Sequence, residues 1–457
     1  MSSNGYQSFI ANKTHLAPKS GFKPLWIPDF LFDFQKYLVE WSIERGRSAN
    51  FADCGLGKSL MELVWAENVV RHTNGRVLLL TPLAVGHQMV AEGNKFGIEC
   101  ERSIDGKLVG KIIVTNYERL HYFNYNDFTG VICDESSILK NFDGATRQAV
   151  TNFMIKTPYR LLATATAAPN DFMELGTHSQ ALGHMGFIDM QNRFFVNDKK
   201  NASNGRYYGK KVEWRFRGHA ETSFWRWVSS WGRAIRKPSD YGFDDGRFIL
   251  PRLMENEHSI EVKEKAPGML FNLPVTGWRE QRAEKKRTIK DRCHKVAELV
   301  NDTGKASLSW CHLDAEADLL EKMIDGGVQI SGRDSDEAKE ERFIAFINGE
   351  ILHLITKPKI GAWGLNLQHC AHCTYFPDHS YERYYQGVRR HWRFGQKNDV
   401  VVDVVTTEGE KMIMANVKRK ADQADKMFTA LVSEMNNAIT IEREEYFVNE
   451  MRVPEWL

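Results

Sequence analysis

The sequence predicts an α/β protein with two domains in series, each built on a parallel sheet covered by helices. Short, continuously apolar segments alternate with longer segments of helical apolar spacing between residues 76 and 164, and again between residues 306 and 405. Continuous apolar strands that alternate with helices are typical of parallel sheets buried on both faces. The chain has 457 residues, which is too long for one typical core and favours two or three domains.

The first series starts with a helix expected over residues 31–41, where apolar side chains recur at helical spacing. Four strands are expected after it, over residues 76–81, 111–115, 131–134 and 159–164. A charged helical segment over residues 278–299 introduces the second series, whose strands are expected over residues 306–310, 328–331, 351–356 and 400–405. We therefore expect a lead-in over residues 1–28, a first domain over 29–250 and a second over 251–457.

The alternating pattern breaks within about residues 190–240, late in the first domain, and residues 197–217 have the character of an inserted loop or hairpin. This insertion is basic and aromatic, and includes Lys210, Lys211 and Arg215. Basic groups can neutralise phosphates while aromatic rings stack on bases, which would suit contact with nucleic acid. The alternative is a two-stranded ribbon whose aromatics pack on the domain. The neighbouring aromatic run, residues 224–231, is expected in the core.

The composition is that of a globular protein, with 42% apolar and 26% charged residues. The net charge is only +2, so affinity for nucleic acid would have to come from local basic patches. No apolar run is long enough to cross a bilayer and the polar start lacks a secretory signal, so no membrane association and a cytoplasmic location are expected. The seven cysteines favour reduced thiols, and the cluster His369–Cys373 lacks the second pair of ligands that a zinc site normally needs.

The segment Phe51–Ser59 has the residues of a phosphate-binding loop, directly before an apolar run with helical character. Gly55 and Gly57 would allow a tight turn whose N–H groups converge on an anion at a helix N-terminus. Lys58 would contact the β and γ phosphates, and the Ser59 hydroxyl would bind Mg²⁺. Ala52 stands where the usual pattern has its first glycine, so this segment by itself leaves open an ordinary glycine-rich turn.

A second group of candidate residues follows the apolar run at residues 128–133, about 75 residues after the loop. Asp134 would hold Mg²⁺ through water, and Glu135 would orient a water for attack on the γ-phosphorus. An Asp-Glu pair at the end of a strand is common by itself. Its combination with Lys58 predicts a site for nucleotide hydrolysis.

The second domain contains the basic segment Tyr384–Gln396. On a helix, Gln386, Arg390 and Arg393 would fall at i, i+4 and i+7, so that one face presents an amide and two guanidinium groups. Guanidinium groups of a separate domain reach the γ-phosphate only when the two domains close, as an arginine finger does. A solvent-exposed basic face is the alternative.

Taken in order, these segments resemble the motifs of superfamily-two helicases, most closely the Swi/Snf-like translocases and the compact versions encoded by bacteriophages. The resemblance extends from about residue 30 to residue 406. It implies two tandem RecA-like domains, with ATP and Mg²⁺ as cofactors. It also implies that Gln35 reads adenine, and that Gly364 belongs to a motif near the nucleotide. The positions matching nucleic-acid-binding motifs are Thr81, Pro82, Thr115, Asn116, Thr164, Thr166, Trp310 and Thr356.

The activity that the resemblance implies is a DNA-stimulated ATPase that couples hydrolysis between the domains to movement along DNA. The DNA is expected to be duplex and bound without regard to sequence, and a protein partner could direct the enzyme to its target. An RNA helicase, and a nucleotide-gated clamp that does not travel, are the alternatives. Three residues depart from the family pattern: Ser137, Ala165 and Ala362. Because Ser137 replaces a coupling His or Asp, coupling could run through Thr164 and Thr166 instead.

Overall fold

The computed structural model describes residues 16–140, 144–168, 172–197, 214–260, 278–361, 366–378 and 380–450. The chain forms two compact units. The first contains the chain up to Asp245 together with the C-terminal segment from Lys426, and the second is Gly246–Asp425. The predicted domain boundary is residue 250 and the predicted second domain extends to residue 457, whereas the segment from Lys426 belongs with the first unit.

Among the described residues of the first unit, seven strands form one sheet in the order β3-β4-β2-β5-β6-β1-β9. Every neighbouring pair in this sheet is parallel. The strands are β1 (Arg47–Ala52), β2 (Val77–Thr81), β3 (Glu101–Arg102), β4 (Ile112–Asn116), β5 (Gly130–Asp134), β6 (Tyr159–Ala163) and β9 (Gly232–Ile235). The carboxyl ends of these strands therefore lie along one edge of the sheet.

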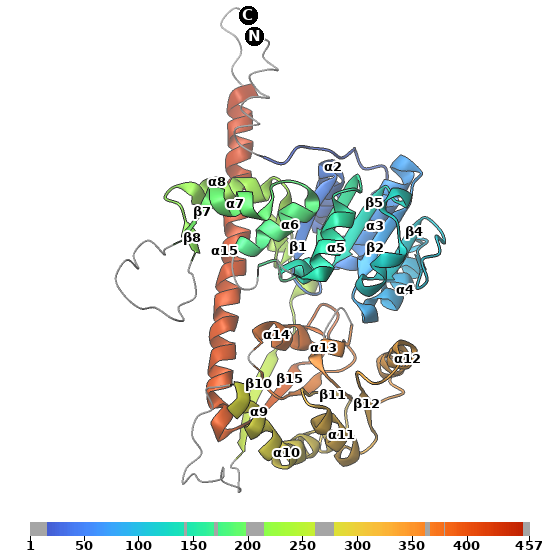
Figure 1. The fold of residues 1–457 in the computed structure, drawn as a ribbon, viewed down its shortest axis with the longest axis vertical. Coiled ribbons are helices and arrows are strands. Elements are labelled where there is room, and N and C mark those ends of the chain that lie inside the picture. Colours follow the sequence, from blue (N-terminus) through green and yellow to red (C-terminus); the bar gives the residue numbers. More distant parts are fainter. Residues whose placement is uncertain are drawn as a thin grey trace, which may run out of the picture. The chain divides into compact units, whose positions relative to one another are not determined.

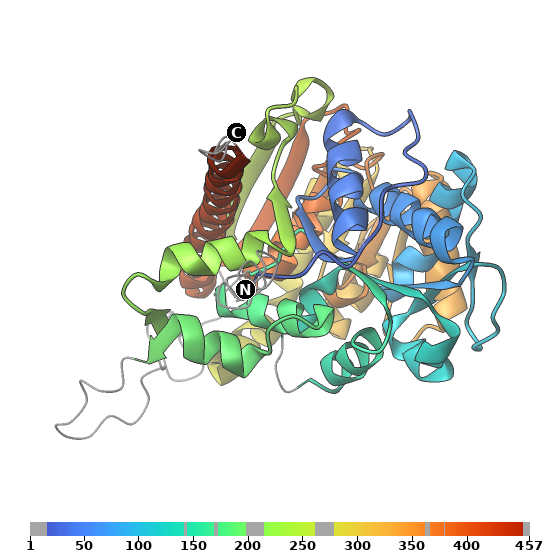
Figure 2. The same cartoon turned by 90° about the horizontal axis from the view of Figure 1, so that it is seen from above.

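Helices cover both faces of the first sheet (Figure 2). The helices of this unit are α2 (Asp33–Arg45), α3 (Lys58–Thr73), α4 (Gly86–Phe96), α5 (Ala145–Met154), α6 (Leu175–Leu182), α7 (Phe187–Phe194) and α8 (Ala220–Ser229). Helices α2, α3 and α4 lie on one face, and α5 and α6 lie on the other. The unit is thus a layered α/β structure, as the sequence predicts.

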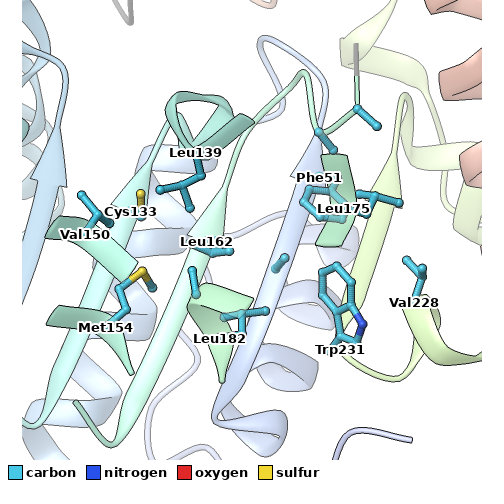
Figure 3. Packing of buried hydrophobic residues seen from close by; sticks show 14 of the residues in the cluster. Phe51, Cys133, Leu139, Val150, Met154, Leu162, Leu175, Leu182, Val228 and Trp231 are labelled. Atoms are coloured by element: carbon cyan, nitrogen blue, oxygen red, sulfur yellow. The ribbon is translucent and has the colours of Figure 1, made fainter. Parts of the chain in front are cut away.

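A hydrophobic core of this unit lies between the sheet and helices α5, α6 and α8. Figure 3 shows how alternate strand residues enter this layer, with Phe51 from β1, Cys133 from β5 and Leu162 from β6. The aromatic run on α8 and directly after it also belongs here: Phe224, Trp225, Trp227 and Trp231 are all fully buried. The prediction that this run is core is therefore confirmed.

The two ends of the insertion pair as an antiparallel ribbon, formed by β7 (Phe195–Asn197) and β8 (Trp214–Phe216). The Phe195 and Phe216 rings stack with their centroids 4.7 Å apart, and both pack against the core. Arg215, between two inward-facing aromatics, is exposed. Lys210 and Lys211 lie outside the described residues. The described ends thus match the ribbon alternative, and nucleic-acid contact by the insertion stays a prediction.

The described part of the second unit contains a six-stranded parallel sheet in the order β10-β15-β14-β11-β13-β12. Its strands are β10 (Leu253–Ile260), β11 (Ser307–Trp310), β12 (Gly327–Ile330), β13 (His353–Thr356), β14 (His372–Tyr375) and β15 (Val400–Thr407). Its helices are α9 (Trp278–Arg287), α10 (Ile289–Asn301), α11 (Asp314–Met323), α12 (Asp336–Ile347), α13 (Pro358–Gly361) and α14 (Tyr381–Arg389). The two-domain, parallel α/β class is therefore confirmed (Figure 1).

Helix α15 (Lys411–Glu450) contributes to both units. Near its start Ile413, Met414 and Val417 are buried within the second unit. Further along, Leu431, Val432 and Met435 are buried in the large core of the first unit. None of the helices formed by described residues is long and apolar enough to span a membrane.

We expect Met435→Ala to lower the stability of the first unit by about 2–5 kcal/mol, because it leaves a cavity in a well-packed core. The exposed Ser433 lies two residues earlier on the same helix. Ser433→Ala is therefore the control and should change the stability by less than about 0.5 kcal/mol. Thermal unfolding of the full chain, followed by circular dichroism, measures both. Equal melting temperatures for the two variants would contradict the packing of α15 on the first unit.

Candidate functional site

Three neighbouring strands of the first sheet, β5, β6 and β1, end side by side and carry the candidate residues. Strand β1 leads through the glycine loop into α3, β5 ends at Asp134, and β6 is followed by Thr164. The register pairs Asp134 with Ala163, which places the residues after each of them next to one another. In open parallel sheets, ligands bind beyond these carboxyl ends.

The glycine loop between β1 and α3 depends on two backbone conformations that favour glycine. Gly55 has φ +89° and Gly57 has φ +77°. A Cβ atom on Gly57 would lie 2.4 Å from Nε2 of Gln35, so this position also lacks room for a side chain. Gly57 is the N-cap of α3. The first N–H groups of a helix have no partner within the helix, and this terminus is therefore a favourable place for an anion.

Gln35 joins helix α2 to the glycine loop. Its Nε2 donates to the Leu56 carbonyl at 2.9 Å, and its Oε1 accepts from the Phe32 N–H at 3.1 Å. The side chain is buried. A carboxamide has two N–H groups and two acceptor lone pairs, so one of each is left for a further ligand. The structure therefore brings Gln35 onto the loop, while its adenine-reading role stays a prediction.

Lys58 is the first residue of α3, and its side chain folds back over the loop. Its Nζ donates to the carbonyls of Ala52 at 2.8 Å and Asp53 at 3.1 Å. Ser59 follows it and is partly exposed. The loop thus holds an ammonium group and a hydroxyl at the start of one helix, as the sequence predicts for a phosphate-binding loop.

The Glu135 carboxylate is held in place by hydroxyl groups on two sides. Its Oε1 accepts from Thr164 Oγ1 at 2.7 Å and from Ser137 Oγ at 3.2 Å. Thr164 Oγ1 in turn accepts from the Thr166 N–H at 3.0 Å. Glu135 also has a left-handed backbone, with φ +56°. A non-glycine residue in this conformation is strained, and such residues concentrate at functional sites.

Tyr117 supports the carboxylate pair from behind, a role that sequence reasoning missed. Its hydroxyl donates to the Asp134 carbonyl and lies 2.9 Å from Cys133 Sγ. The side chain is buried, and this burial raises the pKa of Tyr117 well above its usual value. A phenol that stays protonated is a permanent donor. The sequence offers only the position of Tyr117, directly after Asn116, as a sign of this role.

Oxygen groups from two elements would supply the magnesium site: the Ser59 hydroxyl and the Asp134 carboxylate. Oxygen donors suit Mg²⁺, which keeps several of its waters and takes few protein ligands. The buried carboxyl of Glu62, which has no hydrogen-bond partner among the described residues, also interacts electrostatically with Asp134. The residues present therefore fit a hydrated Mg²⁺ ion.

Three of the predicted nucleic-acid contacts of the first unit, Thr81, Thr115 and Asn116, use their side chains internally. Thr81 Oγ1 donates to the Thr115 carbonyl at 3.4 Å, and Thr115 Oγ1 donates to the Ser103 carbonyl at 2.8 Å. Asn116 Nδ2 donates to the carbonyls at positions 82 and 83, at 3.2 and 3.3 Å. All three side chains are fully buried, whereas Pro82 is partly exposed. Contact with phosphates from these positions would therefore use backbone groups.

The second unit also places predicted contact residues inside. The Trp310 ring is fully buried beside α14, where a Cβ atom on Gly387 would lie 3.3 Å from Trp310 Nε1. Thr356 is buried as well, and its Oγ1 donates to the Ile330 carbonyl at 3.0 Å. These positions give Trp310 and Thr356 a packing role, and their contact with nucleic acid stays a prediction. Gly364 lies outside the described residues.

The predicted helical face of Gln386, Arg390 and Arg393 forms only in part. Helix α14 ends at Arg389, so Arg390 caps it and Arg393 lies in the turns that follow. The Arg390 side chain turns back along the helix, and its Nε donates to the Gln386 carbonyl at 3.1 Å. The expectation that Arg393 continues this face is corrected. The chain leaves the helix for a turn in which Gly395 has φ +91° and Gln396 Oε1 accepts from two successive N–H groups.

Among the comparisons with known proteins, only the search of solved structures gives a likeness. No family model matches the sequence, and no curated protein matches it. Among solved structures, the chain is similar to the Sulfolobus solfataricus SWI2/SNF2 ATPase core in complex with dsDNA. The two are 16% identical, with a TM-score of 0.41 over 91% of this chain and 96% of that one. A likeness of this degree assigns no function, and the bacteriophage resemblance stays a prediction.

Replacing Glu135 tests the left-handed backbone conformation directly. Both Glu135→Ala and Glu135→Gly remove the carboxylate and its hydrogen bonds, but only glycine adopts a positive φ without strain. We expect the glycine variant to be more stable than the alanine variant by about 1 kcal/mol, the reverse of the usual order. Chemical denaturation of the two variants measures the difference. A more stable alanine variant would show that residue 135 is not held at positive φ.

Proposed function

We propose that this protein is a nucleic-acid-stimulated ATPase that moves along DNA. The observation that carries the proposal is the convergence of a phosphate-binding lysine, a carboxylate pair and a threonine at the ends of three neighbouring parallel strands. Phosphoryl transfer needs positioning and electrostatic stabilisation more than covalent chemistry, and this group of residues would supply both. The geometry supports binding of a nucleotide's phosphates, whereas adenine and DNA as the partners are inferred from the motif resemblance.

Different residues of the first unit would bind the phosphates, the adenine and the Mg²⁺ ion. Lys58 would exchange its two carbonyl acceptors for phosphate oxygens, and the α3 N-terminus would bind the same anion. Gln35 would select adenine from its position against the loop. Ser59 and Asp134 would hold the Mg²⁺ ion, which neutralises phosphate charge when bound.

Glu135 would orient the attacking water and accept its proton. Its Oε1 already accepts two hydrogen bonds, from Thr164 and Ser137, so Oε2 is the oxygen that would face the water. Thr164 follows β6, and Thr166 lies two residues further in the segment that resembles a coupling motif. Movement of this segment would therefore change the orientation of the base, which would link hydrolysis to the nucleic acid.

The second unit would complete the site through its basic segment. Arg390 and Arg393 would stabilise the charge that develops on the γ-phosphoryl group, with Gln386 positioning the nucleotide. This requires the two units to close on each other during each cycle of hydrolysis. Duplex DNA would bind across both units through backbone contacts, and a separate protein could direct the enzyme to its target.

The deciding experiment is the ATPase rate with no polymer, with single-stranded DNA, with duplex DNA and with RNA. We expect duplex DNA to stimulate hydrolysis most.

Lys58→Ala and Glu135→Gln should each abolish turnover, but only Glu135→Gln should still bind ATP, because the isosteric amide keeps the site and removes the base. Nucleotide binding and turnover are measured in parallel. A Glu135→Gln protein that hydrolyses ATP at the parental rate would remove this assignment, and stimulation by RNA alone would replace DNA in the proposal.

Thr164 gives a second test, directed at coupling. Thr164→Val keeps the shape of the side chain but removes the hydroxyl that holds Glu135, so we expect a fall of about 10²-fold in stimulated kcat with little change in KM. Thr164→Ser restores the hydroxyl and should recover most of the rate. Equal rates for the valine and serine variants would show that the hydrogen bond to Glu135 is not needed.

A further inference from the structure

Glu62 is a buried carboxyl group that the proposed mechanism does not use. It lies on α3, four residues after Lys58 and three after Ser59. Residues at these spacings share one face of a helix. Glu62 therefore lies on the face that carries the phosphate-binding lysine and the metal-binding hydroxyl, and its side chain is only 1% exposed.

Neither carboxyl oxygen of Glu62 has a hydrogen-bond partner among the described residues. Burial raises the pKa of Glu62 well above its usual value, and the negative charge of Asp134 raises it further. The positive charge of Lys58 acts in the opposite direction. Glu62 thus interacts with the predicted metal ligand and with the phosphate-binding lysine, yet no described group satisfies its oxygens.

A buried polar group without a partner is destabilising. Methionine has nearly the same length and would fill this position without that penalty. The partner that justifies a carboxyl group here would therefore be one that arrives with the nucleotide. A hydrated Mg²⁺ ion brings such partners, because its coordinated waters point their hydrogens outward and need acceptors.

We propose that Glu62 is a positioning residue of the nucleotide site that accepts hydrogen bonds from the waters coordinated to Mg²⁺. The inference rests on the proposed ATPase function and deepens it. In this role Glu62 acts through the water shell and Asp134, and makes no contact with the phosphates. It would fix the position of the ion relative to the carboxylate pair, as groups outside the first coordination sphere do at other metal sites.

The test compares Glu62→Met and Glu62→Gln with the parent protein in two measurements. The first is the melting temperature without nucleotide, and the second is the affinity for ATP with excess Mg²⁺ and with a chelator. We expect Glu62→Met to melt at a higher temperature than the parent and to lose at least tenfold of its Mg²⁺-dependent affinity. The affinity of this variant for ATP should equal that of the parent when a chelator removes Mg²⁺. Glu62→Gln retains one acceptor oxygen and should be intermediate in Mg²⁺ dependence.

Glu67→Gln is the matched control, because Glu67 lies on the same helix but is paired with Arg71 at 2.7 Å. It should leave the Mg²⁺ dependence unchanged. If Glu62→Met binds Mg²⁺ and ATP as the parent does, Glu62 is only a buried acid and the inference is overturned. Should the methionine variant fail to fold, the isosteric glutamine variant decides by the same comparison. A parent protein that binds no nucleotide at all would instead overturn the proposed function, and this inference with it.

Discussion

The hydrogen bond from Thr164 to Glu135 joins the ends of two neighbouring strands, and the candidate site depends on it. Parallel pairing of β5 with β6 brings Asp134 beside Ala163, and the chain then turns so that the next residues meet at 2.7 Å. Glu135 can point its carboxylate toward Thr164 while its backbone has a positive φ, a conformation that costs about 1–2 kcal/mol for a residue with a side chain. The hydroxyl groups of Thr164 and Ser137 and the buried Tyr117 hold this segment in place. The site is therefore built by the surrounding fold rather than by local preference.

Much of the fold could be predicted because the central strands are short, apolar and buried on both faces. Strands β2, β4, β5, β6, β11, β12, β13 and β15 all coincide with predicted segments. The strands missed carry weaker signals. Strand β10 reads Leu-Met-Glu-Asn-Glu-His-Ser-Ile and is largely exposed at the edge of its sheet, so it lacks the continuous apolar character of a central strand. Strand β1 contains serine and asparagine, although all but its first residue are buried.

The sequence identified candidate residues for the site, but it did not show what their side chains contact. Gln35 and Lys58 both contact the glycine loop after β1, and Asp134 and Glu135 lie at the end of β5 in the same sheet, while their roles at a nucleotide stay a prediction. The polar groups at Thr81, Thr115, Asn116 and Thr356 were predicted to face nucleic acid, yet they donate to backbone carbonyls and are buried. A hydroxyl at the end of a strand looks the same in sequence whether it meets a ligand or a neighbouring carbonyl. The packing of the later part of α15 on the first unit could not be predicted either, because apolar residues on a helix do not indicate which core they pack into.

The hydrogen bonds of a buried polar residue show whether it serves the fold or awaits a ligand, a difference that the sequence alone does not show. A side chain such as Thr115, whose hydroxyl is satisfied within the protein, adds to stability whether or not a ligand is bound. Glu62 is the opposite case, since its burial costs stability and no described neighbour offsets the cost. Lys58 lies between them, because its two carbonyl acceptors satisfy it now and phosphate oxygens could replace them without leaving the ammonium group bare. Lys58 and Glu62, in the first turns of α3, are therefore the groups whose hydrogen-bond partners would change when a nucleotide binds. The phosphate charges of the proposed nucleotide would lie at this same helix end.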